Sequence, residues 1–368
     1  MSDGGTMSGT RTGRLRVAEV ALAALALAAL VAVAGCSGGD DAAAPGSGTP
    51  QRDATTTTAP EAVTTSAGCG RSGTPGEVTR TMTSGGLERT YRLHLPPGVG
   101  ADPDHARPLV LDLHGYIEGM DVHAAVSQMG QISDREDLVV VTPNGTGDPV
   151  FWNATQAPGV VDDVAFLGEL LDSVEAETCI DTTRVYAMGL SNGAFMSSRL
   201  ACTMSDRIAA VGTVAGVMVW DDCTPDRPVP VIAIHGDADP IVSFTGAVGE
   251  GSGSLPLDDT TAAVFSRLNL QPVPDAVAAW AERNGCAGEV SEEQIAPDVV
   301  RSTFGCGGDA DVELLRIEDG GHSWPGSTFL QGASDIVGRT SMSISASEEI
   351  WKFFAAHPMA GPGRSDQQ

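Results

Sequence analysis

The sequence Gly189-Leu190-Ser191-Asn192-Gly193 constrains the fold of this chain more than any other stretch. It matches the pattern G-x-S-x-G, in which a serine stands on a sharp turn between a β-strand and an α-helix. A chain with 45 glycines among 368 residues can contain this pattern by chance, and a second copy occurs at residues 35–39. The residues around each copy must therefore decide between them.

Only the later copy lies between a strand pattern and a helix pattern. Residues 184–188 form a short run that contains the β-branched Val185 and the aromatic Tyr186, and residues 194–200 place apolar side chains at helical spacing. A serine nucleophile on such a turn needs a strained backbone, with small residues two positions before and after it. Gly189 and Gly193 meet this need. We therefore predict that Ser191 is a nucleophile, against the alternative of a loop serine beside a helix cap.

Strand patterns alternate with helical patterns along the middle of the chain. Strands are expected at residues 89–95, 108–113, 138–142, 184–188, 209–215, 229–234 and 312–317. This alternation predicts an α/β fold with a mostly parallel sheet and helices on both faces, whose active site lies at the carboxyl ends of the strands. Residues 242–272, rich in Gly, Ser, Asp and Pro, are expected to form a long loop that serves as a lid or cleft wall.

The partners of such a serine follow it in the order acid, then histidine. His322 is the predicted general base because it directly follows the last strand pattern, between two glycines and Ser323-Trp324. Of the other histidines after Ser191, His235 precedes the candidate acid and His357 lies in a tail-like stretch.

Two carboxylates compete for the role of the acid. Asp237 lies nearer the end of the strand at 229–234, whereas Asp239 stands on the following turn, before Pro240. We favour Asp239 as the group that fixes the tautomer of His322 and stabilises the imidazolium. Asp237 remains the alternative.

The negative charge that develops on a substrate carbonyl oxygen needs backbone N–H donors. Tyr116, in a glycine-containing loop after the strand at 108–113, and Asn192 are predicted to supply this oxyanion hole. His114 is expected to be structural. The indole rings of Trp324, Trp152 and Trp220 are predicted to line the substrate cleft, and the alternative is that they fill the core.

Composition excludes several classes of function. The chain has 21 basic and 48 acidic residues, and its formal net charge of -27 would repel nucleic acids. No pair of cysteines after residue 36 has C-x-x-C spacing, so no metal site is predicted. We expect no cofactor, an ester substrate as the only partner, and a monomer.

Residues 1–35 resemble the signal peptide of a bacterial lipoprotein. Basic residues precede an apolar run at 20–34, which small residues and Cys36 follow. This resemblance implies that Cys36 is lipidated and becomes the mature N-terminus, so that the protein is anchored outside the cytoplasmic membrane or secreted. An ordinary signal peptide or an uncleaved anchor is the alternative. Residues 36–68 are expected to be a flexible tether.

Six cysteines remain after Cys36, an even number that predicts disulfides in an exported protein. Sequence leaves fifteen pairings open. The shortest sensible loops favour Cys286 with Cys306 and Cys202 with Cys223, and elimination then leaves Cys69 with Cys179.

Four motifs in this order carry a family resemblance. They are Leu-His-Gly-Tyr at 113–116, Gly-Leu-Ser-Asn-Gly at 189–193, His-Gly-Asp-Ala-Asp-Pro at 235–240 and Gly-Gly-His-Ser-Trp-Pro-Gly at 320–326. Residues 69–358 thereby resemble the secreted polyhydroxybutyrate depolymerases and feruloyl esterases, which are α/β-hydrolases. The resemblance implies a triad of Ser191, Asp239 and His322, with Tyr116 and Asn192 as oxyanion donors.

The expected activity is hydrolysis of short-chain polyester or oligoester bonds through an acyl-enzyme. A feruloyl or acetylxylan-type esterase is the first alternative, and a non-catalytic surface-binding lipoprotein the second. A peptidase or acyltransferase on the same fold is a further rival. Residues 359–368 are expected to be a disordered tail, and the lack of a polymer-binding domain after residue 358 argues against attack on crystalline polymer.

Overall fold

The computed structural model describes residues 64–307 and 310–360. The predicted signal peptide, the lipidation residue Cys36 and nearly all of the predicted tether lie outside the described residues. Within the two described ranges, none of the helices has the length and the apolar character that crossing a bilayer requires.

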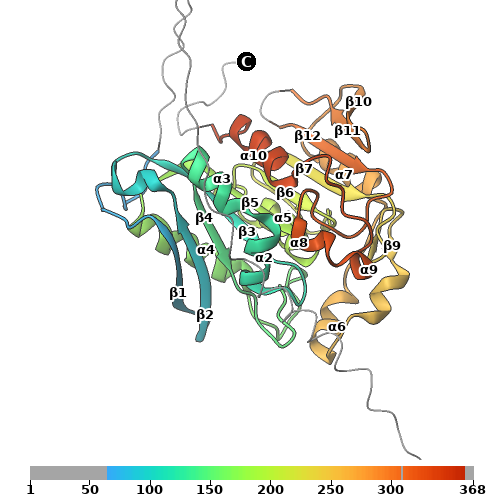
Figure 1. Cartoon of the computed structure of the whole chain (residues 1–368), viewed down its shortest axis with the longest axis horizontal. Coiled ribbons are helices and arrows are strands. Elements are labelled where there is room, and N and C mark those ends of the chain that lie inside the picture. Colours follow the sequence, from blue (N-terminus) through green and yellow to red (C-terminus); the bar gives the residue numbers. More distant parts are fainter. Residues whose placement is uncertain (1–63, 308–309, 361–368) are drawn as a thin grey trace, which may run out of the picture. The chain divides into compact units, whose positions relative to one another are not determined.

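A ten-stranded sheet organises the structure (Figure 1). Its strands are β1 (Gly76–Ser84), β2 (Leu87–Leu95), β3 (Arg107–Leu113), β4 (Val139–Pro143), β5 (Ile180–Leu190), β6 (Val211–Val214), β7 (Val231–Gly236), β10 (Val290–Ala296), β11 (Val299–Phe304) and β12 (Val312–Ile317). The order across the sheet is β1-β2-β4-β3-β5-β6-β7-β12-β11-β10. The strands from β4 to β12 in this order are parallel, and the two at each edge are antiparallel.

Helices cover both faces of the sheet. They are η2 (Pro97–Gly100), α2 (Gly119–Ser127), α3 (Met129–Glu136), α4 (Asp163–Glu177), α5 (Asn192–Thr203), α7 (Val273–Arg283), α8 (Thr328–Gln331), α9 (Ser334–Val337) and α10 (Ala346–Ala356). Alternation along β3 shows the two layers, because Leu109 and Leu111 pack with α4 and α5, whereas Val110 packs with α2, α3 and α10. The predicted α/β class, with a mostly parallel sheet between two helical layers, is confirmed.

The sequence pattern missed three strands of the ten-stranded sheet, namely the edge strands β1 and β10 and the neighbour of β10, β11. In β1 and β10 most residues are exposed, and β10 carries Glu292 and Glu293. Such strands have no continuous apolar run, because only strands buried on both faces need one. The central strands, which do have such runs, lie within a few residues of their predicted positions.

The predicted long loop at 242–272 contains regular structure. It forms the short antiparallel pair β8 (Val242–Ser243) and β9 (Ala247–Val248), the turn η3 (Glu250–Ser254) and the helix α6 (Asp259–Phe265). The side chain of Asp258 accepts a hydrogen bond from the Thr261 amide, and the Thr261 hydroxyl accepts one from the Asp258 amide. This capping box stabilises the start of a helix that a search for long apolar patterns does not detect.

Three disulfides connect the six predicted cysteines. Their pairs are Cys69–Cys179, Cys202–Cys223 and Cys286–Cys306, so the two short loops and the pair left by elimination are confirmed. The first joins the start of the described chain to the residue before β5, across a sequence separation of 110 residues. The second joins Cys202, in the last turn of α5, to Cys223, across a separation of only 21 residues.

Removal of Cys69–Cys179 by two alanine substitutions should destabilise the protein more than removal of Cys202–Cys223. A chain-entropy estimate gives a loss of about 4 to 5 kcal/mol for the longer loop and about 3 kcal/mol for the shorter one. Urea unfolding of both double variants measures the two losses. An equal loss, or a larger one for the shorter loop, would contradict this ranking.

Candidate active site

Ser191 occupies the turn between β5 and α5. Its backbone has φ 54° and ψ -114°, a conformation that residues other than glycine rarely adopt. The Ser191 amide donates to the Val214 carbonyl at 2.8 Å, which fixes the turn against the neighbouring strand β6. The serine is thus held in strained backbone at the carboxyl end of a central strand.

The two glycines of the motif allow backbone segments to touch. A Cβ atom on Gly189 would lie 2.6 Å from the Leu113 carbonyl oxygen, and one on Gly193 only 2.1 Å from the same oxygen. No side chain could relieve these clashes, because the atoms that collide are backbone. The G-x-S-x-G pattern therefore reflects the packing of the turn against the end of β3.

Asp239 and His322 form a buried pair, and both follow the carboxyl ends of central strands, as Ser191 does. Asp239 follows β7 and His322 follows β12, and these strands are parallel neighbours. The Nδ1 atom of His322 lies 2.8 Å from Oδ2 of Asp239. The other carboxylate oxygen of Asp239 accepts from the amides of Ile241 and Val242 at 2.7 and 2.9 Å.

The environment of Asp239 keeps its carboxylate ionised. Burial alone would raise the pKa of Asp239, but the charge of His322 and the hydrogen bonds from His235 and His322 outweigh burial and lower that pKa well below its usual range. His235, which sequence analysis set aside, places its Nε2 atom 3.2 Å from Oδ2 of Asp239 and 2.9 Å from the Val242 carbonyl oxygen. The sequence signal for this contact was the position of His235 at the end of β7, four residues before Asp239.

The competing carboxylate, Asp237, has other partners. Its side chain pairs with Arg316 at 2.8 Å and accepts from the Asp319 amide at 2.8 Å. Asp239, and not Asp237, is the residue that contacts His322.

Ser191 lines a cavity of about 290 Å³ together with Tyr116 and Asn192. Apolar side chains from the segment 242–272, among them Leu255 and Phe265, form much of its wall, and no charged side chain lines it. Among the described residues the Ser191 hydroxyl makes no hydrogen bond. The structure thus groups Ser191 with the two predicted oxyanion donors and joins Asp239 to His322, without a hydrogen bond between the two groups.

The amides of Tyr116 and Asn192 are available as donors. Within the described part of the chain the Tyr116 amide has no hydrogen-bond acceptor. Asn192 is the first residue of α5, and first-turn amides lack an intrahelical partner. The Asn192 side chain is fixed by two hydrogen bonds to the backbone of Trp152, at 2.6 and 3.0 Å.

His114 is buried and serves the structure, as expected. Its Nδ1 atom donates to the Gly115 carbonyl at 2.7 Å, and its Nε2 atom accepts from the Gly145 amide at 2.9 Å. Burial lowers the pKa of His114 to about 4, so the ring is neutral at pH 7.

The prediction that three tryptophans line the cleft is wrong. Trp152 and Trp324 are 0% and 1% exposed, Trp220 is 6% exposed, and none borders the cavity next to Ser191. The indole N–H groups of Trp152 and Trp324 donate to the His114 carbonyl and the Ser347 hydroxyl, and the Trp220 ring packs under Arg199. Each ring is held in the core by these contacts.

Aromatic rings reach the cavity from other parts of the chain. They belong to Tyr116, Phe195 and Phe265. The Tyr116 and Phe265 rings meet edge to face at 5.1 Å, and the Tyr116 hydroxyl donates to the Pro256 carbonyl at 2.5 Å. The apolar residues between 255 and 270 were the available sequence signal for this wall.

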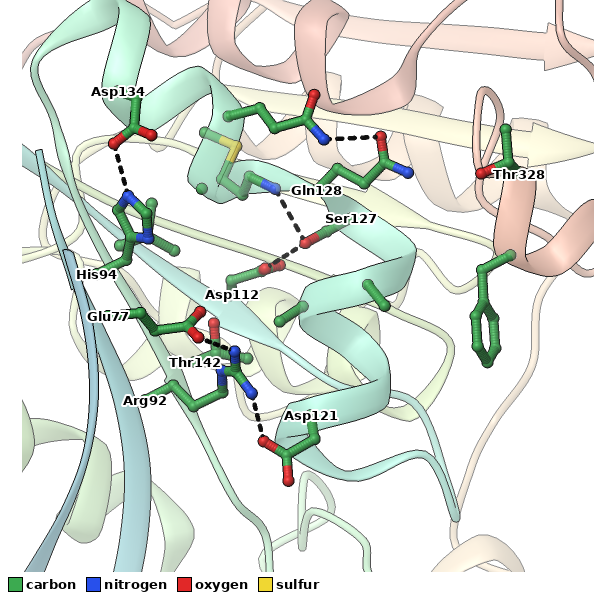
Figure 2. Close-up of a pocket in the computed structure, with 17 residues that line it drawn as sticks. Glu77, Arg92, His94, Asp112, Asp121, Ser127, Gln128, Asp134, Thr142 and Thr328 are labelled. Atoms are coloured by element: carbon green, nitrogen blue, oxygen red, sulfur yellow. Dashed lines mark hydrogen bonds and ion pairs between the residues drawn. The ribbon is translucent and has the colours of Figure 1, made fainter. Parts of the chain in front are cut away.

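A second, larger cavity of about 620 Å³ lies between β2 and α2, and Figure 2 shows its polar lining. Arg92 there pairs with Glu77 and with Asp121, and His94 lies 2.8 Å from Asp134. The guanidinium charge is thus balanced within the cavity wall. None of the predicted catalytic residues lines this cavity. Across the described ranges, no group of histidine, cysteine and carboxylate side chains is arranged to hold a metal ion.

Comparisons with known proteins identify relatives. Residues 89–256 match the family described as "Esterase PHB depolymerase". The chain is 30% identical over 292 residues to a protein of Nocardia uniformis subsp. tsuyamanensis named "Putative esterase NocK", in an alignment that covers 74% of this chain and 81% of that protein. It is 25% identical to "Feruloyl esterase B" of Piromyces equi, over 61% of this chain but only 41% of that longer protein.

A solved structure shares the fold. It is the acetyl xylan esterase from Aspergillus awamori, with a TM-score of 0.51 and 12% sequence identity, over 76% of this chain and 99% of that one. At this identity the likeness concerns the arrangement of the sheet and helices alone.

Substitution of Gly193 by alanine should disrupt the turn at Ser191. The added Cβ would meet the Leu113 carbonyl oxygen at 2.1 Å, so we expect a loss of at least about 2 to 3 kcal/mol of stability. Gly253→Ala is the matched control, because its Cβ would meet nothing within 4 Å and should change stability by about 0.5 kcal/mol or less. Urea unfolding compares the two variants, and equal stabilities would refute the packing argument.

Asp239 should contribute to acid unfolding. Because its folded pKa lies below the unfolded value of about 3.9, its stabilising contribution is complete above that pH and is lost as pH falls toward the folded pKa. Asp239→Asn should therefore lose stability less steeply below pH 4, by up to about 1.4 kcal/mol per pH unit. Urea unfolding between pH 2 and 5 measures both slopes, and identical slopes below pH 4 would show that Asp239 is not the group responsible.

Proposed function

This chain belongs to the esterase family of the PHB depolymerases and feruloyl esterases, and we propose that it is an extracytoplasmic serine esterase whose triad is Ser191, Asp239 and His322. The observation that carries the proposal is the position of the three residues, which all follow the carboxyl ends of parallel central strands. Ser191 stands on a strained turn beside a cavity, and a buried carboxylate–histidine pair follows two nearby parallel strands.

In the proposed reaction the Ser191 hydroxyl oxygen attacks the ester carbonyl carbon while His322 accepts its proton. The tetrahedral intermediate collapses when the C–O bond to the alcohol breaks and His322 donates the proton to the leaving oxygen. Water then attacks the acyl-enzyme by the same route in reverse and releases the carboxylic acid. Asp239, ionised and hydrogen-bonded to Nδ1, holds the imidazole and stabilises the imidazolium.

The oxyanion is stabilised by the amides of Tyr116 and Asn192 in this proposal. Both residues border the Ser191 cavity, and the Tyr116 amide has no competing acceptor in the described chain. Donors fixed in advance of the reaction stabilise developing charge more than donors that must reorganise.

The proposed substrates are esters with a short, uncharged acyl group, such as hydroxyalkanoate oligomers. The support is the apolar lining of the cavity, which offers no charged side chain to a carboxylate or ammonium group on the acyl part. Feruloyl and acetylxylan-type esters belong in the same test panel, because relatives of this chain carry those names.

Export from the cytoplasm is proposed from two features. Three disulfides require an oxidising compartment to form and persist. Residues 1–35 have the pattern of a lipoprotein signal, from which we propose a lipid anchor at Cys36, a tether over 36–68 and a catalytic domain over 69–358.

Ser191→Ala and His322→Ala should each lower kcat by at least about 10⁴-fold while the fold stays intact, because triad residues act as a unit. Hydrolysis of p-nitrophenyl, hydroxybutyrate-oligomer and feruloyl esters measures activity, and a fluorophosphonate probe measures labelling of Ser191. Asp239→Asn should cost somewhat less, and Asp237→Asn is its matched control. An unlabelled wild-type protein would refute the serine mechanism, and a greater loss in Asp237→Asn would reassign the acid.

A further inference from the structure

A row of buried ionisable side chains lies beneath α2, on the face of the sheet that α2, α3 and α10 cover. The imidazole of His123 lies between two carboxylates, with Nε2 at 2.8 Å from Asp112 and Nδ1 at 3.1 Å from Glu118. Ser127 donates to the other oxygen of Asp112 at 2.6 Å, and Figure 2 shows this contact at the wall of the larger cavity. None of these side chains belongs to the proposed triad.

His123 carries a positive charge in this environment. Burial alone would lower its pKa, but the charges of Asp112 and Glu118 and their hydrogen bonds outweigh burial and raise the pKa to about 10. Burial would likewise raise the pKa of Glu118, and the charge of His123 lowers it instead. A carboxylate, an imidazolium and a second carboxylate thus stand in a row with almost no solvent contact.

This row ends at the loop that contains Tyr116. The same Glu118 oxygen that contacts His123 also accepts from the Gly115 amide at 2.6 Å. Gly115 immediately precedes Tyr116, and Ile117 after it has φ 64°, in the left-handed region. A loop with such strained backbone keeps one conformation only when its surroundings fix it.

We propose that Glu118, held in place by His123 and Asp112, is a positioning residue that aims the Tyr116 amide into the Ser191 cavity. The proposal rests on the proposed function, in which that amide is an oxyanion donor. Glu118 anchors the amide on one side of Tyr116, and the hydrogen bond from the Ile117 amide to the Val150 carbonyl, at 2.9 Å, anchors the other.

A purely stabilising role explains this row less well. A buried ion pair adds little net stability, because removing the charges from water costs about as much as their attraction returns. Pre-orienting a donor, by contrast, affects the transition state directly, where loss of one oxyanion donor costs about 10²- to 10³-fold in kcat.

The test is the kinetics of Glu118→Ala on a p-nitrophenyl ester that the wild type hydrolyses. We expect kcat to fall about 10- to 100-fold, because the Tyr116 amide is no longer held in its orientation. KM should change less than about 3-fold, because the apolar cavity that binds the ester is unchanged. The inhibition constant of a trifluoromethyl ketone, which forms a tetrahedral adduct on Ser191, should rise in the same proportion. Glu118→Gln, which keeps an oxygen for the Gly115 amide, should retain more kcat than Glu118→Ala.

Asp311→Ala is the matched control, because it removes a histidine–carboxylate contact to His357 at 2.9 Å, at the amino end of β12. Its kcat should equal that of the wild type. Unchanged kcat in Glu118→Ala, or a loss no larger than in Asp311→Ala, would overturn the positioning role while the proposed function stands.

If Glu118→Ala does not fold, Glu118→Gln decides, with a kcat about 3- to 10-fold lower expected. A wild type without esterase activity or probe labelling would overturn both proposals.

Discussion

The structure depends on a backbone contact between the turn at Ser191 and the end of β3. Gly189 and Gly193 both approach the Leu113 carbonyl oxygen so closely that neither could carry a Cβ. The turn that makes this contact holds Ser191 at φ 54°, and the contact lies at the end of β3, where the chain continues toward Tyr116. The candidate nucleophile and the candidate oxyanion loop therefore share one boundary, so a shift of either would displace the other.

Two buried histidine–carboxylate groups lie close to the proposed site, and one of them contacts the loop after β3 through the Gly115 amide. Asp239 holds His322 after the end of β12, and Asp112 and Glu118 hold His123 beneath α2. Trp324 connects them, because it follows His322 by two residues and its ring packs edge to face against His123 at 5.6 Å. This contact explains why that tryptophan is in the core: its ring covers one side of a buried imidazolium instead of facing a substrate.

Sequence patterns predicted the parts of the molecule where local chemistry and burial agree. The apolar runs of β3, β4 and β7 located the central sheet, and Ser191, Asp239 and His322, which follow β5, β7 and β12, were expected at the carboxyl ends of its parallel strands. The edge strands β1 and β10 escaped prediction because their exposed residues need no apolar period. The tryptophans were misplaced because proximity in sequence to His322 or to a strand end does not decide which face of the sheet a large ring covers.

The wall of the cavity also could not be predicted from an apolar sequence pattern. Phe265 and Leu255 come from a stretch rich in glycine and serine, whose short helix starts at a capping box and not at a long apolar pattern. That stretch packs on the Tyr116 ring, and the Tyr116 hydroxyl donates to the Pro256 carbonyl. Tyr116 consequently belongs to two systems, because its amide is the proposed oxyanion donor while its side chain supports the wall of the cavity beside Ser191. Changes in the wall should therefore alter catalysis as well as substrate preference, which a wall packed only on itself would not do.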